Sequence, residues 1–190
     1  MQVDKVILDL GGVVFETTGK NSSLIDWGIV SKLNHKYGHA LNIGEDLFPV
    51  FMQDYNQLTH QNLEGHEFLK AIFDTLHFNQ ELINFLKARF KKLIILSDNY
   101  RENIAYIAER YHFHAWADRQ FYSFDFEMTK DNPILFQKVL ALSEYAAAEV
   151  IFIDDSPRKI ASAEQCGIKS YLFQNNKLLF QQLKQDGYEI

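Results

Sequence analysis

The chain has 190 residues, the size of one domain with room for an inserted segment. Its net charge of −6 at pH 7 gives no general attraction to nucleic acid or to an anionic membrane. A single cysteine, Cys166, excludes an internal disulfide, and no apolar run approaches the length of a membrane span. We therefore expect a soluble, cytoplasmic protein without a nucleic-acid or membrane partner.

The first predicted strand is a short apolar run, Val6 to Leu8, followed by Asp9 and, after Leu10, by two glycines. Apolar residues that end in a glycine pair are typical of a buried strand leading into a tight loop. Ligands of open α/β sheets bind just beyond the carboxyl ends of such strands. A carboxylate buried there without a partner would be unfavourable, so Asp9 is the first residue for which we expect a function.

From Thr17 to about Arg89 we find helical spacing and no convincing strand. Three apolar stripes recur at helical intervals: Leu24, Trp27, Val30 and Leu33; Leu47, Val50, Phe51 and Tyr55; Phe68, Leu69, Ile72, Phe73 and Leu76. Gly38, Gly44 and Gly65 separate them, and a further helix over 81–87 leads back to the sheet. We predict that 16–89 is a helical insertion, and that 1–15 together with 90–190 forms the core domain.

After this insertion strands alternate with helices. The strands are expected over Lys92 to Ser97, within the aromatic stretch His112 to Ser123, over Glu149 to Asp154 and over Ser170 to Phe173. Asn132-Pro133 and Ser156-Pro157 are typical helix starts, and Gly167 is a typical helix end. The pattern predicts an α/β fold: a Rossmann-like, doubly wound parallel sheet with an inserted helical cap.

Three predicted strands end in polar side chains, which parallel strands would bring to one edge of the sheet. These side chains are Asp9, Ser97 and the pair Asp154-Asp155. Crowded carboxylates repel one another unless a cation lies among them, and hard oxygen ligands suit Mg²⁺. Lys130, just before the Asn132-Pro133 helix start, could add a positive charge. An aspartate, a hydroxyl, a lysine and a carboxylate-held Mg²⁺ are a set suited to phosphoryl transfer.

The sequence resembles a haloacid dehalogenase (HAD) superfamily hydrolase, from the subfamily I branch whose helical cap follows the first motif. Four segments in family order carry the resemblance: Leu8-Asp-Leu-Gly-Gly-Val-Val14; Ile95-Leu-Ser97; Lys130-Asp-Asn-Pro133 with Phe136; and Phe152-Ile-Asp-Asp-Ser156 with Ile160, Ala163 and Gly167. They reach from Asp9 to Gly167. The resemblance implies a HAD-like core domain.

By this resemblance Asp9 is the nucleophile that becomes an aspartyl-phosphate. Ser97 would bind the phosphoryl group, and the neighbouring Asp98 and Asn99 would belong to the same substrate-binding segment. Lys130 would neutralise the phosphoryl group and steady the nucleophile. The metal ligands would be Asp9, the backbone carbonyl of Gly11, Asp155 and Asp154, the last through water or by orienting its neighbour.

The match to the family breaks at Gly11, where the usual first motif has a second aspartate that acts as acid and base. Losing such a group typically costs about 10²–10⁴ in rate. We hypothesise that Glu16 or Asp98 supplies the missing proton transfer; Asp-Leu-Gly with an acidic residue seven positions after the nucleophile also resembles sugar-1-phosphate phosphatases. Lys159 stands where the family often has Asn, and could pair with a rim carboxylate or face solvent.

The predicted function is a Mg²⁺-dependent phosphatase for a small phosphorylated metabolite. Gly11 supports the alternative of a catalytically impaired ligand-binding or regulatory protein. A 2-haloacid dehalogenase, which uses the same aspartate on carbon without metal, is disfavoured because the Asp154-Asp155 pair has a clear role only with a cation. The substrate's identity stays open, as does the choice between monomer and homodimer.

Overall fold

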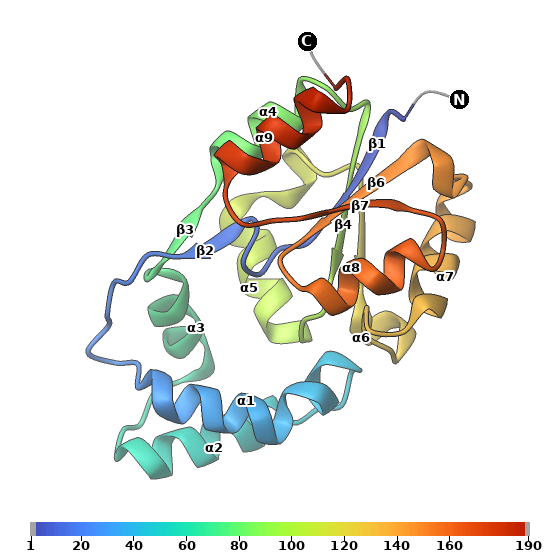
Figure 1. The fold of residues 1–190 in the computed structure, drawn as a ribbon. Helices are drawn as coiled ribbons and strands as arrows, with labels where there is room; N and C mark the ends of the chain where they lie inside the picture. The colour runs from blue at the N-terminus through green and yellow to red at the C-terminus, as the bar shows by residue number, and fades with distance from the viewer. Residues whose placement is uncertain (1–2, 189–190) are drawn as a thin grey trace.

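The computed structural model describes residues 3–188 and contains a five-stranded parallel sheet with helices on both faces (Figure 1). The strand order is β5-β4-β1-β6-β7. The strands are β1 (Lys5–Leu8), β4 (Lys92–Ser97), β5 (Arg119–Tyr122), β6 (Val150–Asp154) and β7 (Lys169–Leu172). The predicted Rossmann-like α/β core is confirmed, including the strand expected within the aromatic stretch.

The central strand β1 pairs with β4 and β6 along its whole length, and apolar clusters bury both of its faces. Ile7 packs with Phe136 and Phe152 on one face, whereas Val6 and Leu8 pack in a separate cluster on the other. Side chains of a strand alternate between faces, so a strand covered on both sides needs an uninterrupted apolar run. This requirement explains why the first motif begins with consecutive apolar residues.

Two sets of helices cover the sheet. On the face of Val6 and Leu8 lie α4 (Gln80–Lys87), α5 (Arg101–Tyr111) and α9 (Asn176–Gln185). On the face of Ile7 lie α7 (Pro133–Ser143) and α8 (Pro157–Glu164), and the short α6 (Ser123–Phe126) follows β5. The helix start predicted at Asn132-Pro133 is present, with the Asn132 side chain accepting a hydrogen bond from the Ile134 N–H.

Three helices form a separate cap below the sheet: α1 (Trp27–Asn42), α2 (Phe48–Thr59) and α3 (Gly65–Phe73) (Figure 1). Their cluster includes Phe51, Tyr55 and Phe68, and the Phe51 and Phe68 ring centroids are 5.7 Å apart. The Tyr55 hydroxyl accepts a hydrogen bond from the Asp26 N–H and donates one to the Leu24 carbonyl, which fixes the start of α1.

Details of the cap differ from the predicted stripes. Gly38 lies inside α1 and does not end a helix, because that helix continues to Asn42. Leu24, Trp27 and Val50 are exposed, and Ile25 takes the buried place at the start of α1. Helical spacing identifies each helix, but the exact limits of its buried face depend on the elements packed against it, which the sequence does not specify.

The expectation of no strand between Thr17 and Arg89 is wrong for one short segment. β3 (Leu76–Phe78) pairs antiparallel with β2 (Phe15–Thr17), so the two connections between core and cap form one ribbon. The Phe15 and Phe78 rings lie 5.5 Å apart, and Tyr111 packs against both. Three residues are too few to display an alternating pattern, and β3 exists because β2 and this aromatic cluster hold it.

The predicted boundaries of core and insertion stay predictions, although the packing of α4 bears on them. Leu82, Ile83 and Leu86 of this helix join the cluster that covers the sheet.

Within residues 3–188, none of the helices combines the length and the apolar character needed to cross a bilayer.

We predict that Phe136→Ala lowers the free energy of unfolding by about 3–5 kcal/mol, because the ring is fully buried 5.0 Å from the Phe152 ring. The matched control on the same helix is Leu142→Ala, where the side chain is 56% exposed and about 0.5 kcal/mol or less is expected. Urea unfolding of both variants measures the difference. Equal destabilisation of the two would contradict the packing described for α7.

Candidate active site

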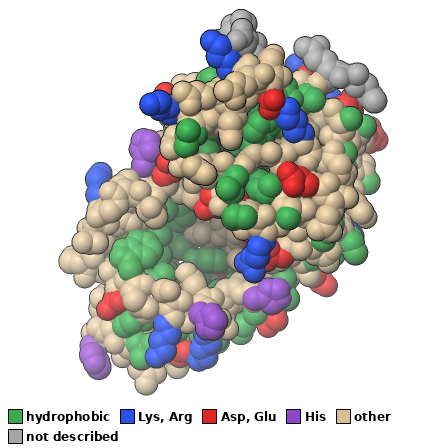
Figure 2. All heavy atoms as spheres, in the orientation of Figure 1, with side chains coloured by type: hydrophobic (Ala, Val, Ile, Leu, Met, Phe, Trp, Pro, Cys, Tyr) green, Lys and Arg blue, Asp and Glu red, His purple; other side chains and the backbone are tan. Residues whose placement is uncertain are grey.

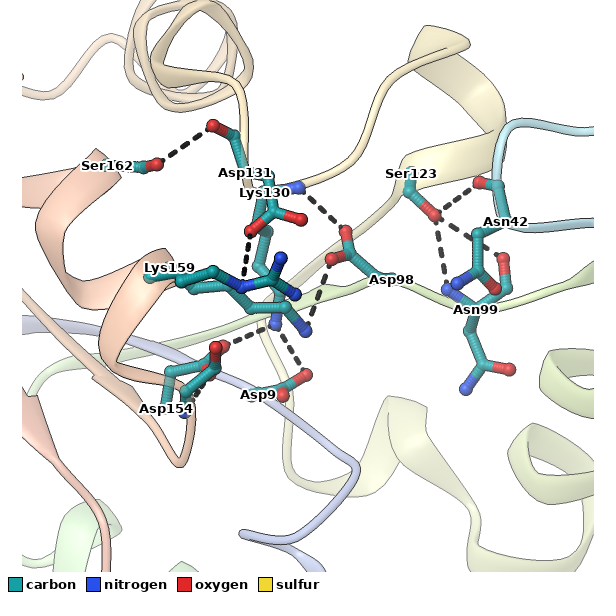
Figure 3. A network of polar contacts seen from close by, with 12 residues as sticks. Asp9, Asn42, Asp98, Asn99, Ser123, Lys130, Asp131, Asp154, Lys159 and Ser162 are labelled. Atoms are coloured by element: carbon teal, nitrogen blue, oxygen red, sulfur yellow. Dashed lines mark hydrogen bonds and ion pairs between the residues drawn. The ribbon is translucent and has the colours of Figure 1, made fainter. Parts of the chain in front are cut away.

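The carboxyl ends of three neighbouring strands gather polar side chains at one edge of the sheet. Asp9 directly follows β1, Ser97 ends β4 and Asp154 ends β6. The Asp9 N–H donates a hydrogen bond to the Ile153 carbonyl at 3.0 Å, which ties the loop after β1 to β6. Lys130 reaches the same edge from the segment between α6 and α7 (Figure 3).

Lys130 lies between two carboxylates at the centre of this site. Its Nζ is 2.7 Å from Asp9 Oδ1 and 2.6 Å from Asp154 Oδ2, and the lysine side chain is fully buried (Figure 3). A buried ammonium without partners would be strongly destabilising, so this position is tenable only because both carboxylates surround it. The lysine in turn fixes the orientation of Asp9.

Asp98 joins the lysine segment to α8. Its Oδ1 accepts a hydrogen bond from the Lys130 N–H at 2.9 Å, and its Oδ2 lies 3.2 Å from Lys159 Nζ (Figure 3). The Asp98 side chain is only 6% exposed. Both of its oxygens therefore have partners. Asp98 thus holds the segment of Lys130 and the start of α8, which carries Lys159, against the site.

The acidic side chains are placed suitably for one small cation. Oxygen atoms of Asp9, Asp154 and Asp155 lie within 4.8 Å of one another. Opposite ligands of an octahedral Mg²⁺ lie about 4.2 Å apart, since each oxygen is about 2.1 Å from the ion. An all-carboxylate donor set also matches the oxygen preference of Mg²⁺. The residues present thus fit the ion that the sequence predicts.

Gly12 makes room for Asp155. The glycine has a φ of +73°, and a Cβ added there would lie 2.1 Å from Asp155 Oδ2. Only a glycine allows the backbone after β1 to pass this close to the carboxylate. The second glycine of the first motif therefore has a specific steric role.

The charges around Lys130 separate the pKa values of the carboxyl groups. Burial alone would raise the pKa of Asp9, but the charges of Lys130 and Lys159 outweigh it and hold that pKa below its usual value. Burial raises the pKa of Asp154 to about 6, and the negative charge of Asp9 adds to the rise. Asp155 is shifted upward for the same two reasons, so its pKa is also raised. Asp9 is the carboxylate that stays ionised most readily.

The predicted substrate-binding segment after β4 lies beside this network. Ser97 is buried at the end of the strand, and Asn99 follows Asp98 on the way into α5. The Asn99 side-chain oxygen accepts hydrogen bonds from the Tyr100 N–H and from Asn103 Nδ2. Their roles in binding a phosphoryl group stay predictions.

Glu16 and Gly11 lie in different surroundings. Glu16 is on β2, opposite His77 in the ribbon, and it is not one of the residues joined to Lys130 or Asp98. Burial raises the pKa of Glu16, and the charged groups that act on it are His77 and Glu81. Gly11 is exposed in the loop after β1, and its role as a metal ligand stays a prediction.

Two further residues emerge from the structure. Lys159, which the sequence left open between a rim carboxylate and solvent, pairs with Asp98. Its place in the first turn of α8, shortly after the Asp154-Asp155 pair, is a signal that could have assigned it to the site. Ser123 donates a hydrogen bond to the Asn42 carbonyl at 2.5 Å and so joins α6 to the end of α1 in the cap (Figure 3). No sequence pattern identifies that contact.

A polar cavity of about 520 Å³ lies between cap and core. Its walls include Asn34 and His39 from α1, Asn103 from α5, and Arg158 and Lys159 from α8. Figure 2 shows the surface hollowed between the cap and the α/β part of the molecule. This volume is in the range of sites for small molecules.

Comparison with known proteins defines the class of this chain. Residues 29–173 match the model of the haloacid dehalogenase-like hydrolases. The chain therefore belongs to the haloacid dehalogenase-like hydrolase family, as its motifs predict.

Similar proteins extend over almost the whole chain. A HAD family enzyme from Bacteroides thetaiotaomicron has a TM-score of 0.74 at 16% identity, over 95% of this chain and 99% of its own. The same enzyme has been solved in complex with magnesium and inorganic phosphate, with a TM-score of 0.70 at 16% identity and coverage of 94% and 99%. At these identities the likeness concerns the fold.

Two further similar proteins are a solved dehalogenase and a protein described as uncharacterized. An L-2-haloacid dehalogenase from Xanthobacter autotrophicus has a TM-score of 0.63 at 15% identity, over 100% of this chain and 85% of its own. An uncharacterized protein from Dictyostelium discoideum is 21% identical, over 91% of this chain and 92% of its own length. The fold is thus shared by an enzyme solved with magnesium and inorganic phosphate and by a dehalogenase.

We predict that Gly12→Ala weakens Mg²⁺ binding by about 10- to 100-fold, because the new methyl group displaces the Asp155 carboxylate. The control is Gly19→Ala, which has similar backbone strain at φ +72°, but apart from its chain neighbours none of residues 3–188 lies within 4 Å of the added Cβ. Isothermal titration calorimetry with Mg²⁺ compares the two. If both variants bind Mg²⁺ like the unmodified protein, Asp155 does not hold the ion.

We also predict that Mg²⁺ affinity falls as the pH drops below about 6. The Asp154 carboxyl group, whose pKa is about 6, carries a proton at lower pH, and the cation must displace this proton. Because binding releases a proton, the Mg²⁺ affinity rises with pH. It is nearly constant above pH 7 and falls by up to about tenfold per pH unit below pH 6. Titrations between pH 5 and 8 measure this, and an affinity equal at pH 5 and pH 7.5 would contradict it.

Proposed function

We propose that this chain is a Mg²⁺-dependent phosphatase that transfers the phosphoryl group of a small phosphate monoester to Asp9 and then to water. The observation that carries the proposal is the placement of an ionised Asp9, fixed by Lys130, within a group of carboxylates suited to Mg²⁺. The magnesium and phosphate bound by the Bacteroides enzyme of the same fold support it.

In the first step an oxygen of Asp9 attacks phosphorus, a new P–O bond forms and the P–O bond to the leaving group breaks. The Leu10 N–H at 2.8 Å and Lys130 Nζ at 2.7 Å both contact Oδ1 of Asp9. The carboxylate is thus anchored through one oxygen, and Oδ2 is available to attack. Bound Mg²⁺ would neutralise negative charge on the phosphoryl oxygens, with Asp9, Asp155 and, directly or through water, Asp154 as its protein ligands.

The leaving alkoxide must then gain a proton, and the water that attacks the aspartyl-phosphate must lose one. With Gly11 in place of the usual aspartate, the two proposed substitutes are Asp98 and Glu16. Asp98 already belongs to the network, but both of its oxygens are occupied by donors. Glu16 would need the β2–β3 ribbon to bring it closer. A leaving group of low pKa needs little proton donation, and the proposal therefore favours such substrates.

The cap supports a small substrate. The cavity between cap and core has amide and cationic side chains on its walls, which suit a polar, phosphorylated molecule better than a folded protein surface. The contact between Ser123 and Asn42 holds the cap against the core at one side of this cavity. The cap would exclude water from the aspartyl-phosphate until its hydrolysis.

We predict that the protein releases phosphate from a panel of phosphate esters only with Mg²⁺, and that Asp9→Asn abolishes this, by about 10³-fold or more. The amide of asparagine is a poor nucleophile, so Asp9→Asn cannot form the aspartyl-phosphate that water would hydrolyse. Asp46→Asn, at an exposed position on the cap, is the matched control and should retain activity. Phosphate release is measured on p-nitrophenyl phosphate and on sugar phosphates.

Other outcomes would replace the proposal. Metal-independent chloride release from 2-chloropropionate, lost in Asp9→Asn, would identify a dehalogenase. Binding of inorganic phosphate without release from any ester would identify a ligand-binding relative, the alternative that Gly11 favours.

A further inference from the structure

The two ammonium groups of the site differ in their exposure. Lys130 has no exposed surface, and its ammonium contacts two carboxylates at 2.6 and 2.7 Å. Asp9 and Lys130 are both absent from the walls of the cavity between cap and core. A ligand that reaches Asp9 from the cavity therefore passes the residues of the network that do line it.

Lys159 is one of these residues. It lies on the cavity wall together with Asp98, its side chain is 19% exposed, and it extends from the first turn of α8 toward Asp98 (Figure 3). An ammonium has three N–H donors, and Asp98 Oδ2 at 3.2 Å occupies one of them. The remaining donors are available for oxygen atoms of a ligand.

The charge balance of the site supports the same residue. Four carboxylates, those of Asp9, Asp98, Asp154 and Asp155, face two ammonium groups. A phosphate monoester adds further negative charge next to Asp9, and of the two ammonium groups that of Lys159 has both exposed surface and a place on the cavity wall. Arg158 also lines the cavity but is 81% exposed and leans toward Asp131, so its charge is largely screened by water.

We propose that Lys159 binds the phosphoryl group of the substrate directly, while Lys130 holds Asp9 in place. This assignment rests on the proposed phosphatase function and names the residue of this chain that recognises the substrate's phosphoryl oxygens. Asp98 is then a positioning residue, because it holds Lys159 over the site and ties the Lys130 segment to β4.

The test compares Lys159→Met, which keeps the apolar stem and removes the charge, with Lys159→Arg and with Lys138→Met. Lys138 is an exposed lysine on α7 and serves as the control. For Lys159→Met we expect the KM for p-nitrophenyl phosphate and the inhibition constant for inorganic phosphate to rise together, by about 10- to 100-fold. Lys159→Arg should restore most of the phosphate binding, and Lys138→Met should match the unmodified protein.

Lys130→Met provides the contrast, with folding checked by circular dichroism. We expect it to lower kcat more than it weakens phosphate inhibition, because Asp9 loses its anchor while Lys159 remains. A Lys159→Met variant that is less stable but inhibited by phosphate as strongly as the unmodified protein would overturn the proposal, since Lys159 would then only stabilise Asp98.

Calorimetry with inorganic phosphate and Mg²⁺ separates this proposal from the phosphatase function. Suppose that the unmodified protein binds phosphate but cleaves no ester, and that Lys159→Met does not bind phosphate. This result would support the role of Lys159 and refute the phosphatase function. Equal phosphate binding by both proteins, or none by the unmodified protein, would overturn the role of Lys159.

Discussion

The structure depends on one buried ammonium shared by two carboxylates. Lys130 contacts Asp9 after β1 and Asp154 at the end of β6, and its backbone N–H is held by Asp98 after β4. Removing Lys130 would leave two buried carboxylates without their shared cation, and breaking a buried ion pair is typically destabilising by about 3–5 kcal/mol. The same contacts that make the sheet edge stable also fix Asp9, the proposed nucleophile, and keep its pKa low. Stability and chemistry therefore rest on the same atoms.

This arrangement divides the work between two lysines. Lys130 is enclosed and serves the protein's own carboxylates, whereas Lys159 lies on the cavity wall between cap and core. By the resemblance to the family, the chain departs from the usual residues both at Gly11, where an aspartate is expected, and at Lys159, where an asparagine is expected. An added cation stabilises negative charge on the phosphoryl oxygens, but it cannot replace proton transfer.

The sequence predicts the core of the fold because the physical signals there are strong. Buried parallel strands need continuous apolar runs, and polar side chains at their carboxyl ends must converge; this is why Asp9, Ser97 and the Asp154-Asp155 pair could be proposed from the sequence. Lys130 could be proposed from its place just before the Asn132-Pro133 helix start. The β2–β3 ribbon could not be predicted, since its pairing depends on the aromatic cluster around Phe15. The role of Ser123 depends on a contact between segments 81 residues apart, which no local pattern encodes.

The most direct measurement is a crystal structure of the protein with Mg²⁺ and beryllofluoride, a mimic of a phosphoryl group on aspartate. We expect beryllium bonded to an oxygen of Asp9, Mg²⁺ between Asp9 and Asp155, and Lys159 Nζ within hydrogen-bond distance of a fluoride. Beryllofluoride bound elsewhere, or Mg²⁺ held without Asp9, would contradict this expectation.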